Sequence, residues 1–195
     1  MLLAITLISG LALGGAYQLT KGRIAEQELA AEAAAYAAVA PDAASFGAAE
    51  ELETRMTELT AEDGTVADGQ FGKVVYDSAY AALDESGSVI GHVVNVTTKE
   101  GFGGEISIST GIALDGTVTG VAFLTINETA GLGMRATEPE FYEQFVGKNV
   151  ESYELTKSAA SADNQIEALS GASVTSNAVT NAMNAALYLV QSAEG

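Results

Sequence analysis

Residues 71–127 read FGKVVYDSAYAALDESGSVIGHVVNVTTKEGFGGEISISTGIALDGTVTGVAFLTIN, and their alternation of apolar and polar residues is typical of β-strands. Glycines interrupt the pattern, as they do between the strands of hairpins. An isoleucine-rich run ends at an Asp115-Gly116 pair, and Val118–Ile126 follows as another apolar run. Asp-Gly between two apolar runs is a strong hairpin signal. This stretch therefore predicts an antiparallel sheet.

Two segments on the C-terminal side carry helix signals. Residues 139–147 begin with Pro139 and end with Gly147, the usual order at the two ends of a short helix. Residues 177–191 place apolar side chains on one face at helical spacing. That face consists of Val179, Met183, Ala186, Leu187 and Val190. Together with the strands, these segments predict an α+β fold: one domain with an antiparallel sheet and a C-terminal helix.

The N-terminal end of the sequence has a different character. Residues 1–19 carry no charge, and roughly 20 apolar residues span a bilayer, so we predict a transmembrane helix at residues 1–20. A cleaved signal peptide has a similar apolar pattern and is the alternative. Lys21 and Arg23 close the segment. Taken alone, these two cations would place the following chain in the cytoplasm.

Residues 21–70 are predicted to form a helical neck and an acidic linker. Residues 24–39 are rich in Ala and Glu, which favour a helix, and Pro41 ends it. The next stretch is acidic and weakly periodic, with a short helix expected at residues 48–59. Residues 71–195 then form the predicted soluble domain.

Composition excludes several classes of function. The net charge is −18 with only eight lysines and arginines, which argues against nucleic-acid binding. The chain has no cysteine, so it forms no disulfide, no thiolate zinc site and no Cys-ligated iron–sulfur cluster of its own. Its single histidine, His92, cannot make a histidine-based metal site alone. We expect no metal site and no catalytic acid, base or nucleophile.

Residues 167–179, EALSGASVTSNAV, concentrate hydroxyl groups directly before the predicted C-terminal helix. The hydroxyls belong to Ser170, Ser173, Thr175 and Ser176. A helix N-terminus offers unpaired N–H groups and a positive dipole end, which together hold anions such as phosphate. Gly171 and Ala172 keep the loop slim enough for a ligand to approach the backbone. The alternative is ordinary helix capping by Ser and Thr.

Two glycine-containing loops follow predicted strands. Residues 127–134, NETAGLGM, contain two glycines around a leucine, a tight loop whose backbone amides can hydrogen-bond a planar heterocycle. An ordinary strand-to-helix loop is the alternative. Residues 101–104, GFGG, permit a bulge or a close backbone approach.

These three motifs together resemble the FMN-binding domain family over residues 71–192. Residues 170–173 (SGAS) look like its flavinylation motif, which is an acidic residue, two variable residues and then Ser/Thr-Gly-Ala-Thr. Residues 128–133 (ETAGLG) resemble its Glu-Thr-Pro-Gly-Leu-Gly loop. Three residues depart from the family pattern: Ser173 stands in place of Thr, Glu167 in place of Asp and Ala130 in place of Pro.

The resemblance implies a covalent cofactor and the residues that hold it. FMN would be esterified through its phosphate to Ser173, with Thr175 as the rival acceptor. Ser170, Gly171, Ala172 and Thr175 would surround the attachment point. The flavin would lie against Glu128, Thr129, Gly131, Leu132 and Gly133. A separate flavin transferase would attach FMN, using FAD as donor.

With one N-terminal membrane helix, the chain is similar to the G subunits of Rnf-type electron-transport complexes, relatives of the C subunits of sodium-pumping NADH:quinone reductases. This implies a membrane-anchored electron carrier whose partners are the other members of the complex, with its soluble domain on the extracytoplasmic side. One alternative is a free-standing extracytoplasmic FMN-binding reductase subunit of another electron chain. Another is an anchored binding module without flavin.

Overall fold

The computed structural model describes residues 32–66 and 69–193 of the 195-residue chain. The chain divides into two compact units, Met1–Ala34 and Ala35–Gly195, and the second contains the sheet. The predicted transmembrane segment, residues 1–20, lies outside the described residues. Among those that are described, no helix combines the length and apolar character needed to cross a bilayer.

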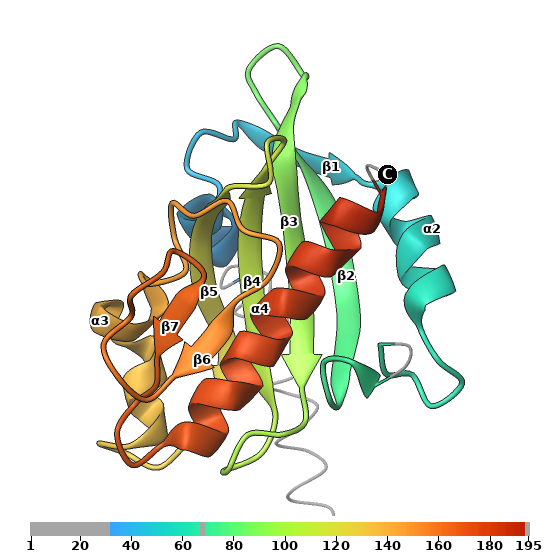
Figure 1. The fold of residues 1–195 in the computed structure, drawn as a ribbon. Helices are drawn as coiled ribbons and strands as arrows, with labels where there is room; N and C mark the ends of the chain where they lie inside the picture. The colour runs from blue at the N-terminus through green and yellow to red at the C-terminus, as the bar shows by residue number, and fades with distance from the viewer. Residues whose placement is uncertain (1–31, 67–68, 194–195) are drawn as a thin grey trace, which may run out of the picture. The chain divides into compact units, whose positions relative to one another are not determined.

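A five-stranded antiparallel sheet forms the centre of the second unit (Figure 1). The strands lie side by side in chain order: β1 (Ser45–Ala48), β2 (Val74–Leu83), β3 (Val89–Thr98), β4 (Ile106–Ala113) and β5 (Val118–Ile126). The expected hairpin joins β4 to β5, and Gly116 in its turn has a φ of +85°. The Thr117 N–H donates to Asp115 Oδ1 at 2.9 Å and closes that turn.

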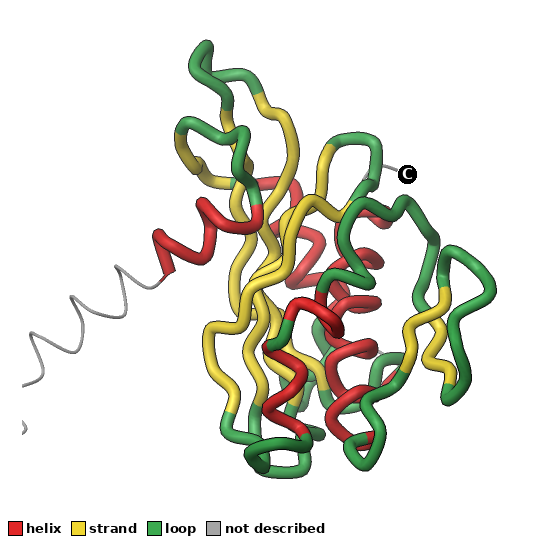
Figure 2. Tube along the Cα trace, turned by 90° about the vertical axis from the view of Figure 1, so that its left-hand side faces the viewer, coloured by secondary structure: helices red, strands yellow, loops and turns green. Residues whose placement is uncertain are grey.

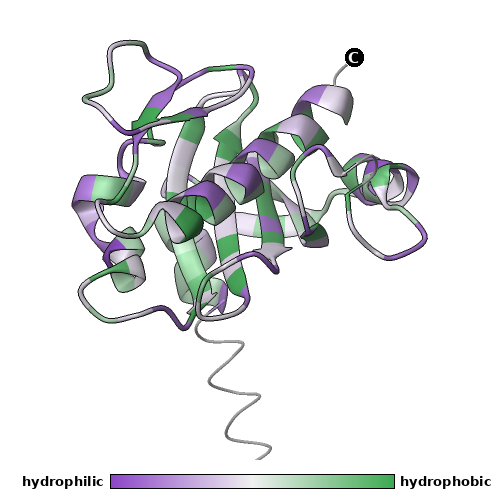
Figure 3. Ribbon diagram, turned by 60° about the horizontal axis from the view of Figure 1, so that its bottom comes forward, coloured by the Kyte–Doolittle hydropathy of each residue, from purple (hydrophilic) through white to green (hydrophobic). Residues whose placement is uncertain are grey.

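Helices and two further strands surround the sheet. They are α2 (Glu50–Leu59), the 3₁₀-helix η2 (Gly133–Thr137), α3 (Pro139–Tyr142), the parallel strands β6 (Glu154–Thr156) and β7 (Gln165–Glu167), and α4 (Ser173–Ala193). Helix α4 crosses one face of the sheet over β2, β3 and β4 (Figures 1 and 2). Its predicted apolar face is buried, and the strands beneath it carry blocks of apolar residues (Figure 3). The predicted antiparallel sheet with a C-terminal helix is confirmed.

The opposite face of the sheet is covered by the chain just before β1. Because strand side chains alternate between faces, Val94 faces α4 while Val93 faces the other way. Tyr36 and Val39, in the last turn of a helical segment ending at residue 39, pack with Val93 in a small second core. The Asn95 Nδ2 group donates to the Tyr36 hydroxyl at 2.8 Å, so a polar bond also holds this segment to the sheet.

Two paired glycines allow this close approach. Gly111 on β4 and Gly120 on β5 are opposite each other in the sheet, and both lie under Val39. A Cβ atom on Gly120 would lie 2.6 Å from the Val39 Cα, and one on Gly111 would overlap the Val39 carbonyl oxygen. That oxygen accepts a hydrogen bond of 2.5 Å from the Thr119 hydroxyl. The absence of side chains at Gly111 and Gly120 therefore lets the backbone around Val39 pack directly against the sheet.

We expect Gly111→Ala to lower the free energy of unfolding by about 1–3 kcal/mol, the usual cost of overpacking a close contact. The added methyl must displace backbone atoms of Val39 and the Thr119 hydroxyl. Chemical denaturation followed by circular dichroism measures the effect. Gly47→Ala on β1 is the matched control, since its new methyl would meet only the Leu83 side chain, at 3.2 Å. Equal stabilities of the two variants would contradict this account.

The structure also differs from the sequence-based expectation at three places. β1 and α2 belong to the same compact unit as the sheet, although the sequence pattern assigns their residues to the linker. The short parallel pair β6 and β7 was not expected. Helix α4 begins at Ser173, four residues before the expected start at residue 177.

Candidate functional site

The start of α4 is built by Gly171 and Ser176. Gly171 has a φ of +80°, which turns the chain sharply before the helix. The Ser176 hydroxyl accepts the Leu169 N–H and donates to the Ala172 carbonyl oxygen, both at 2.9 Å. This hydroxyl therefore closes the turn that precedes the helix. The expectation that Ser173 lies before the helix is wrong, because this closed turn lets the helix begin at Ser173 itself.

No hydroxyl caps the free N–H groups of this helix start. Within the described residues, the backbone N–H groups of Ser173, Val174 and Thr175 have no hydrogen-bond partner. Such groups at a helix start attract anions because the helix dipole is positive there. The Ser176 hydroxyl therefore has a structural role in the turn, whereas helix capping does not account for the hydroxyls of Ser170, Ser173 and Thr175. What the geometry offers is an open anion site.

The two candidate acceptor hydroxyls differ sharply in access. Ser173 is exposed, whereas Thr175 is only 1% exposed. A hydroxyl that another protein is to modify must be accessible. The two hydroxyls that the sequence offers therefore differ in accessibility, with Ser173 the accessible one.

The loop after β5 folds back on itself before η2. The Thr129 carbonyl oxygen accepts the N–H groups of Leu132 and Met134 at 3.1 and 3.2 Å. Gly131, at the tip, has a φ of +74° and no atom near the position of a Cβ. Gly133, in contrast, is buried. The loop therefore turns Gly131 outward and Gly133 inward.

This loop and the start of α4 meet in one pocket of about 360 Å³. Its lining is Phe102, Glu128, Thr129, Leu132, Gly133, Gly171, Ala172, Ser173, Val174 and Thr175. Three large apolar side chains stand exposed there: Phe102 at 74%, Val174 at 52% and Leu132 at 43%. The pocket thus combines an apolar wall with the uncapped helix start, which suits a planar apolar ligand that carries an anionic group.

The inner end of the pocket is tightly built around Glu128. Both carboxylate oxygens of Glu128 are buried and have no hydrogen-bond partner among the described residues. A Cβ atom on Gly133 would lie 2.7 Å from Glu128 Oε2 and 2.6 Å from Thr175 Oγ1. A Cβ atom on Gly101 would lie 2.9 Å from Glu128 Oε1. Glycine at both positions is what leaves room for this carboxylate.

Most of the predicted site residues are brought together, and two are not. Gly131 does not line the pocket because its loop turns it outward. Ser170 lines a neighbouring cavity of about 470 Å³ together with Arg135 and Glu167. Phe102 was not singled out from the sequence, although it lies within the GFGG segment. An aromatic residue flanked by glycines was the available signal.

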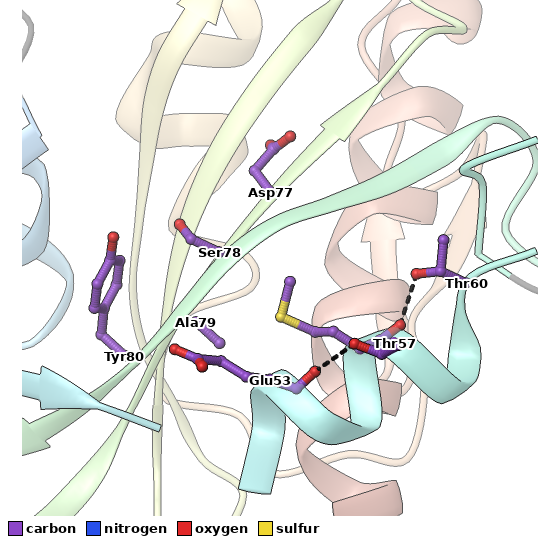
Figure 4. A pocket seen from close by; sticks show the side chains of 8 residues that line it. Glu53, Thr57, Thr60, Asp77, Ser78, Ala79 and Tyr80 are labelled. Atoms are coloured by element: carbon purple, nitrogen blue, oxygen red, sulfur yellow. Dashed lines mark hydrogen bonds between the residues drawn. The ribbon is translucent and has the colours of Figure 1, made fainter. Parts of the chain in front are cut away.

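A larger cavity, about 560 Å³, lies between α2 and β2 (Figure 4). It contains two carboxylates, those of Glu53 and Asp77, and none of the predicted site residues. Burial raises the pKa of the Asp77 carboxyl, against the opposing effect of a 2.7 Å hydrogen bond from Thr97. The Thr57 and Thr60 hydroxyls donate to carbonyl oxygens of their own helix. An acidic cavity of this kind does not suit a phosphate ligand.

Fold and pocket together define an α+β domain whose pocket suits a planar apolar ligand that carries an anionic group. Residues 101–188 match the model of the FMN-binding domain family. The chain is 30% identical over 196 residues to the G subunit of the Na⁺-translocating ferredoxin:NAD⁺ oxidoreductase complex of Acetobacterium woodii, covering 98% of this chain and 89% of that protein. The chain belongs to the family of these G subunits, and its residues 101–188 match the FMN-binding domain.

Further relatives cover less of the chain. The G subunit of the ion-translocating oxidoreductase complex of Methanosarcina acetivorans is 39% identical over 117 residues, 60% of each chain. Among solved structures, NqrC of Shewanella oneidensis gives a TM-score of 0.49 at 21% identity over 60% of each chain. The C subunit of the Na⁺-translocating NADH-quinone reductase of Parabacteroides distasonis gives a TM-score of 0.45 at 16% sequence identity. That match covers 74% of this chain and 92% of the other. Both TM-scores are below 0.5, so neither structural comparison is used to describe the fold of this chain.

Proposed function

We propose that the chain is a membrane-anchored carrier of covalently bound FMN, the G subunit of an Rnf-type ion-translocating ferredoxin:NAD⁺ oxidoreductase complex. The observation that supports this best is the pocket itself. It joins the loop at residues 128–133 to an exposed hydroxyl, Ser173, at an uncapped helix start. The family membership supplies the complex in which such a carrier would serve.

Each part of the pocket has a role toward FMN. The free N–H groups at residues 173–175 and the α4 dipole hold the phosphate without any lysine or arginine. Phe102, Leu132 and Val174 give the isoalloxazine ring an apolar surface. Bound FMN would supply reversible acceptance of electrons, and the protein would position the ring and tune its potential. In this proposal the described residues hold and position FMN, and none of them is expected to act on a substrate.

Attachment needs a separate flavin transferase with FAD as donor. The Ser173 oxygen attacks the phosphorus of the FMN half of FAD, the pyrophosphate bond breaks, AMP leaves and the serine proton is released. The product is a phosphoester between FMN and Ser173. The exposure of Ser173 suits this reaction, since the acceptor must enter the active site of another protein.

Co-expression with a flavin transferase and with the other members of the complex tests the proposed function. We expect absorbance near the 450 nm flavin band in the purified chain and co-purification of those other proteins. Flavin without them would indicate a free-standing FMN-binding protein instead. If the chain carries no flavin under these conditions, the proposal is wrong, and the remaining alternative is an anchored binding module without flavin.

Residues 1–20 are proposed to be the membrane anchor, with the FMN-binding domain on the extracytoplasmic side. We expect a chain beginning at residue 32 to be recovered in the soluble fraction, since it lacks the apolar run. In the full chain, a reporter enzyme active only outside the cytoplasm should be active when fused after Gly195. Truncated protein that stays in washed membranes without its partners would contradict a single membrane anchor at residues 1–20. An inactive reporter in the full chain would contradict the extracytoplasmic placement of the domain.

A further inference from the structure

Glu128 carries an unsatisfied carboxylate at the inner end of the pocket. Both oxygens are shielded from solvent, and no donor of the described chain reaches either of them. The ion pairs found among the described residues join Arg55 to Glu58 and Arg135 to Glu138, so neither neutralises Glu128. A buried polar group without a partner costs about 1–3 kcal/mol, and more when it is charged. Such a group in a ligand pocket points to a donor on the ligand.

We infer that the Glu128 carboxylate accepts a hydrogen bond from the N–H edge of the flavin ring and thereby lowers the reduction potential of the flavin. This inference rests on the proposed function. It assigns Glu128 a role in redox tuning that is separate from holding the cofactor in place.

Charge decides which part of FMN meets Glu128. The phosphate is anionic, and like charges in a poorly hydrated pocket repel strongly. The phosphate therefore stays at Ser173, where the helix start faces solvent, and not beside the carboxylate. Glu128 lies further in, beside Gly133 and Thr175, where a Cβ on Gly133 would touch both residues. The uncharged part of FMN reaches that end, and the ring carries its N–H group.

The direction of the effect follows from electrostatics. Reduction adds electrons to the ring, and a fixed negative charge beside it raises the free energy of the reduced form. The carboxylate is shielded from solvent, so water and salt weaken its effect on the flavin potential less than they would weaken that of a surface charge. Replacing it with a neutral amide of the same shape keeps a hydrogen-bond acceptor and removes the charge. Glu128→Gln should therefore make the flavin easier to reduce.

The test compares the midpoint potentials of the wild-type, Glu128→Gln and Glu85→Gln chains, each flavinylated by a transferase. Glu85→Gln is the matched control, because Glu85 is exposed in the β2–β3 turn at the other end of the sheet. For Glu128→Gln we expect the equilibrium to shift about tenfold toward reduced flavin, which is about 30 mV for two electrons. The control should match the wild type. An unchanged potential in Glu128→Gln overturns the inference.

Two further measurements keep the inference testable if Glu128→Gln takes up no flavin. Glu128→Asp retains the charge and should have a midpoint potential near that of the wild type, and a rise of about 30 mV or more would overturn the inference. In the wild-type chain, the infrared difference spectrum between oxidised and reduced states should contain a carboxylate band, and its absence overturns the inference. Failure of the proposed function looks different, because the wild-type chain itself would then carry no flavin.

Discussion

In a chain carrying Ser173→Ala, in-gel flavin fluorescence after co-expression with a flavin transferase is expected to be lost completely. The reason is chemical: alanine has no oxygen to form the phosphoester. The serine occupies the acceptor position of the family motif, and it is exposed at the first residue of α4. Mass spectrometry of the peptide that contains Ser173 should show one added FMN-phosphoryl group in the wild type and none in the variant.

Two companion substitutions make the result specific. Ser173→Thr should preserve or raise the label, since it keeps the hydroxyl and restores the residue usual in the family. Thr175→Ala should retain the covalent flavin, because Thr175 is 1% exposed and a transferase cannot reach it in the folded chain. If Thr175→Ala loses the label while Ser173→Ala keeps it, the attachment site moves to Thr175.

The central sheet was readable from the sequence because its signals are local. Alternation marks a strand with one face against a helix, and an Asp-Gly pair marks a hairpin. β1 was missed because four residues in an acidic, weakly periodic stretch carry little pattern. The pair β6 and β7 was missed because each strand has three residues, too few to show an alternation.

The start of α4 shows where apolar periodicity is a poor guide to a helix boundary. The apolar face at helical spacing indicated a helix beginning near residue 177, although α4 begins at Ser173. The N-cap is Ala172, whose carbonyl oxygen accepts the Ser176 N–H at 3.0 Å. The Ser176 hydroxyl bonds to both sides of the turn, although Ser176 itself lies within the first turn of the helix.

The meeting of the two loops depends on topology that no single motif contains. In a sheet with strands in chain order, the connections after β3 and after β5 leave at the same end. The helix α4 begins at that end too, so residues 102, 128, 129, 132, 133 and 171–175 converge there. The exclusion of Gly131 and Ser170 depends on the direction in which each loop turns, and only the structure gives that direction.

Gly133→Ala is expected to disorder the bound flavin while leaving it covalently attached. The new methyl would lie 2.6 Å from Thr175 Oγ1 and 2.7 Å from Glu128 Oε2, distances that force the inner end of the pocket to rearrange. Ser173 lies at the solvent side, so the transferase still reaches its hydroxyl. We expect normal in-gel fluorescence, faster quenching of the flavin by iodide, and electron transfer at least about tenfold slower, because a small displacement of a reacting group has effects of that order or greater.

Gly131→Ala is the matched control for this prediction, because it alters the same loop without entering the pocket. Gly131 has a φ of +74° and no atom within 4 Å of an added Cβ. Its substitution should therefore cost about 1–2 kcal/mol of backbone strain, measured by thermal unfolding, and leave flavin quenching and electron-transfer rate near wild type. The opposite pattern, with Gly131→Ala slowing electron transfer and Gly133→Ala leaving it unchanged, would mean that the flavin lies outside the pocket lined by Glu128 and Thr175.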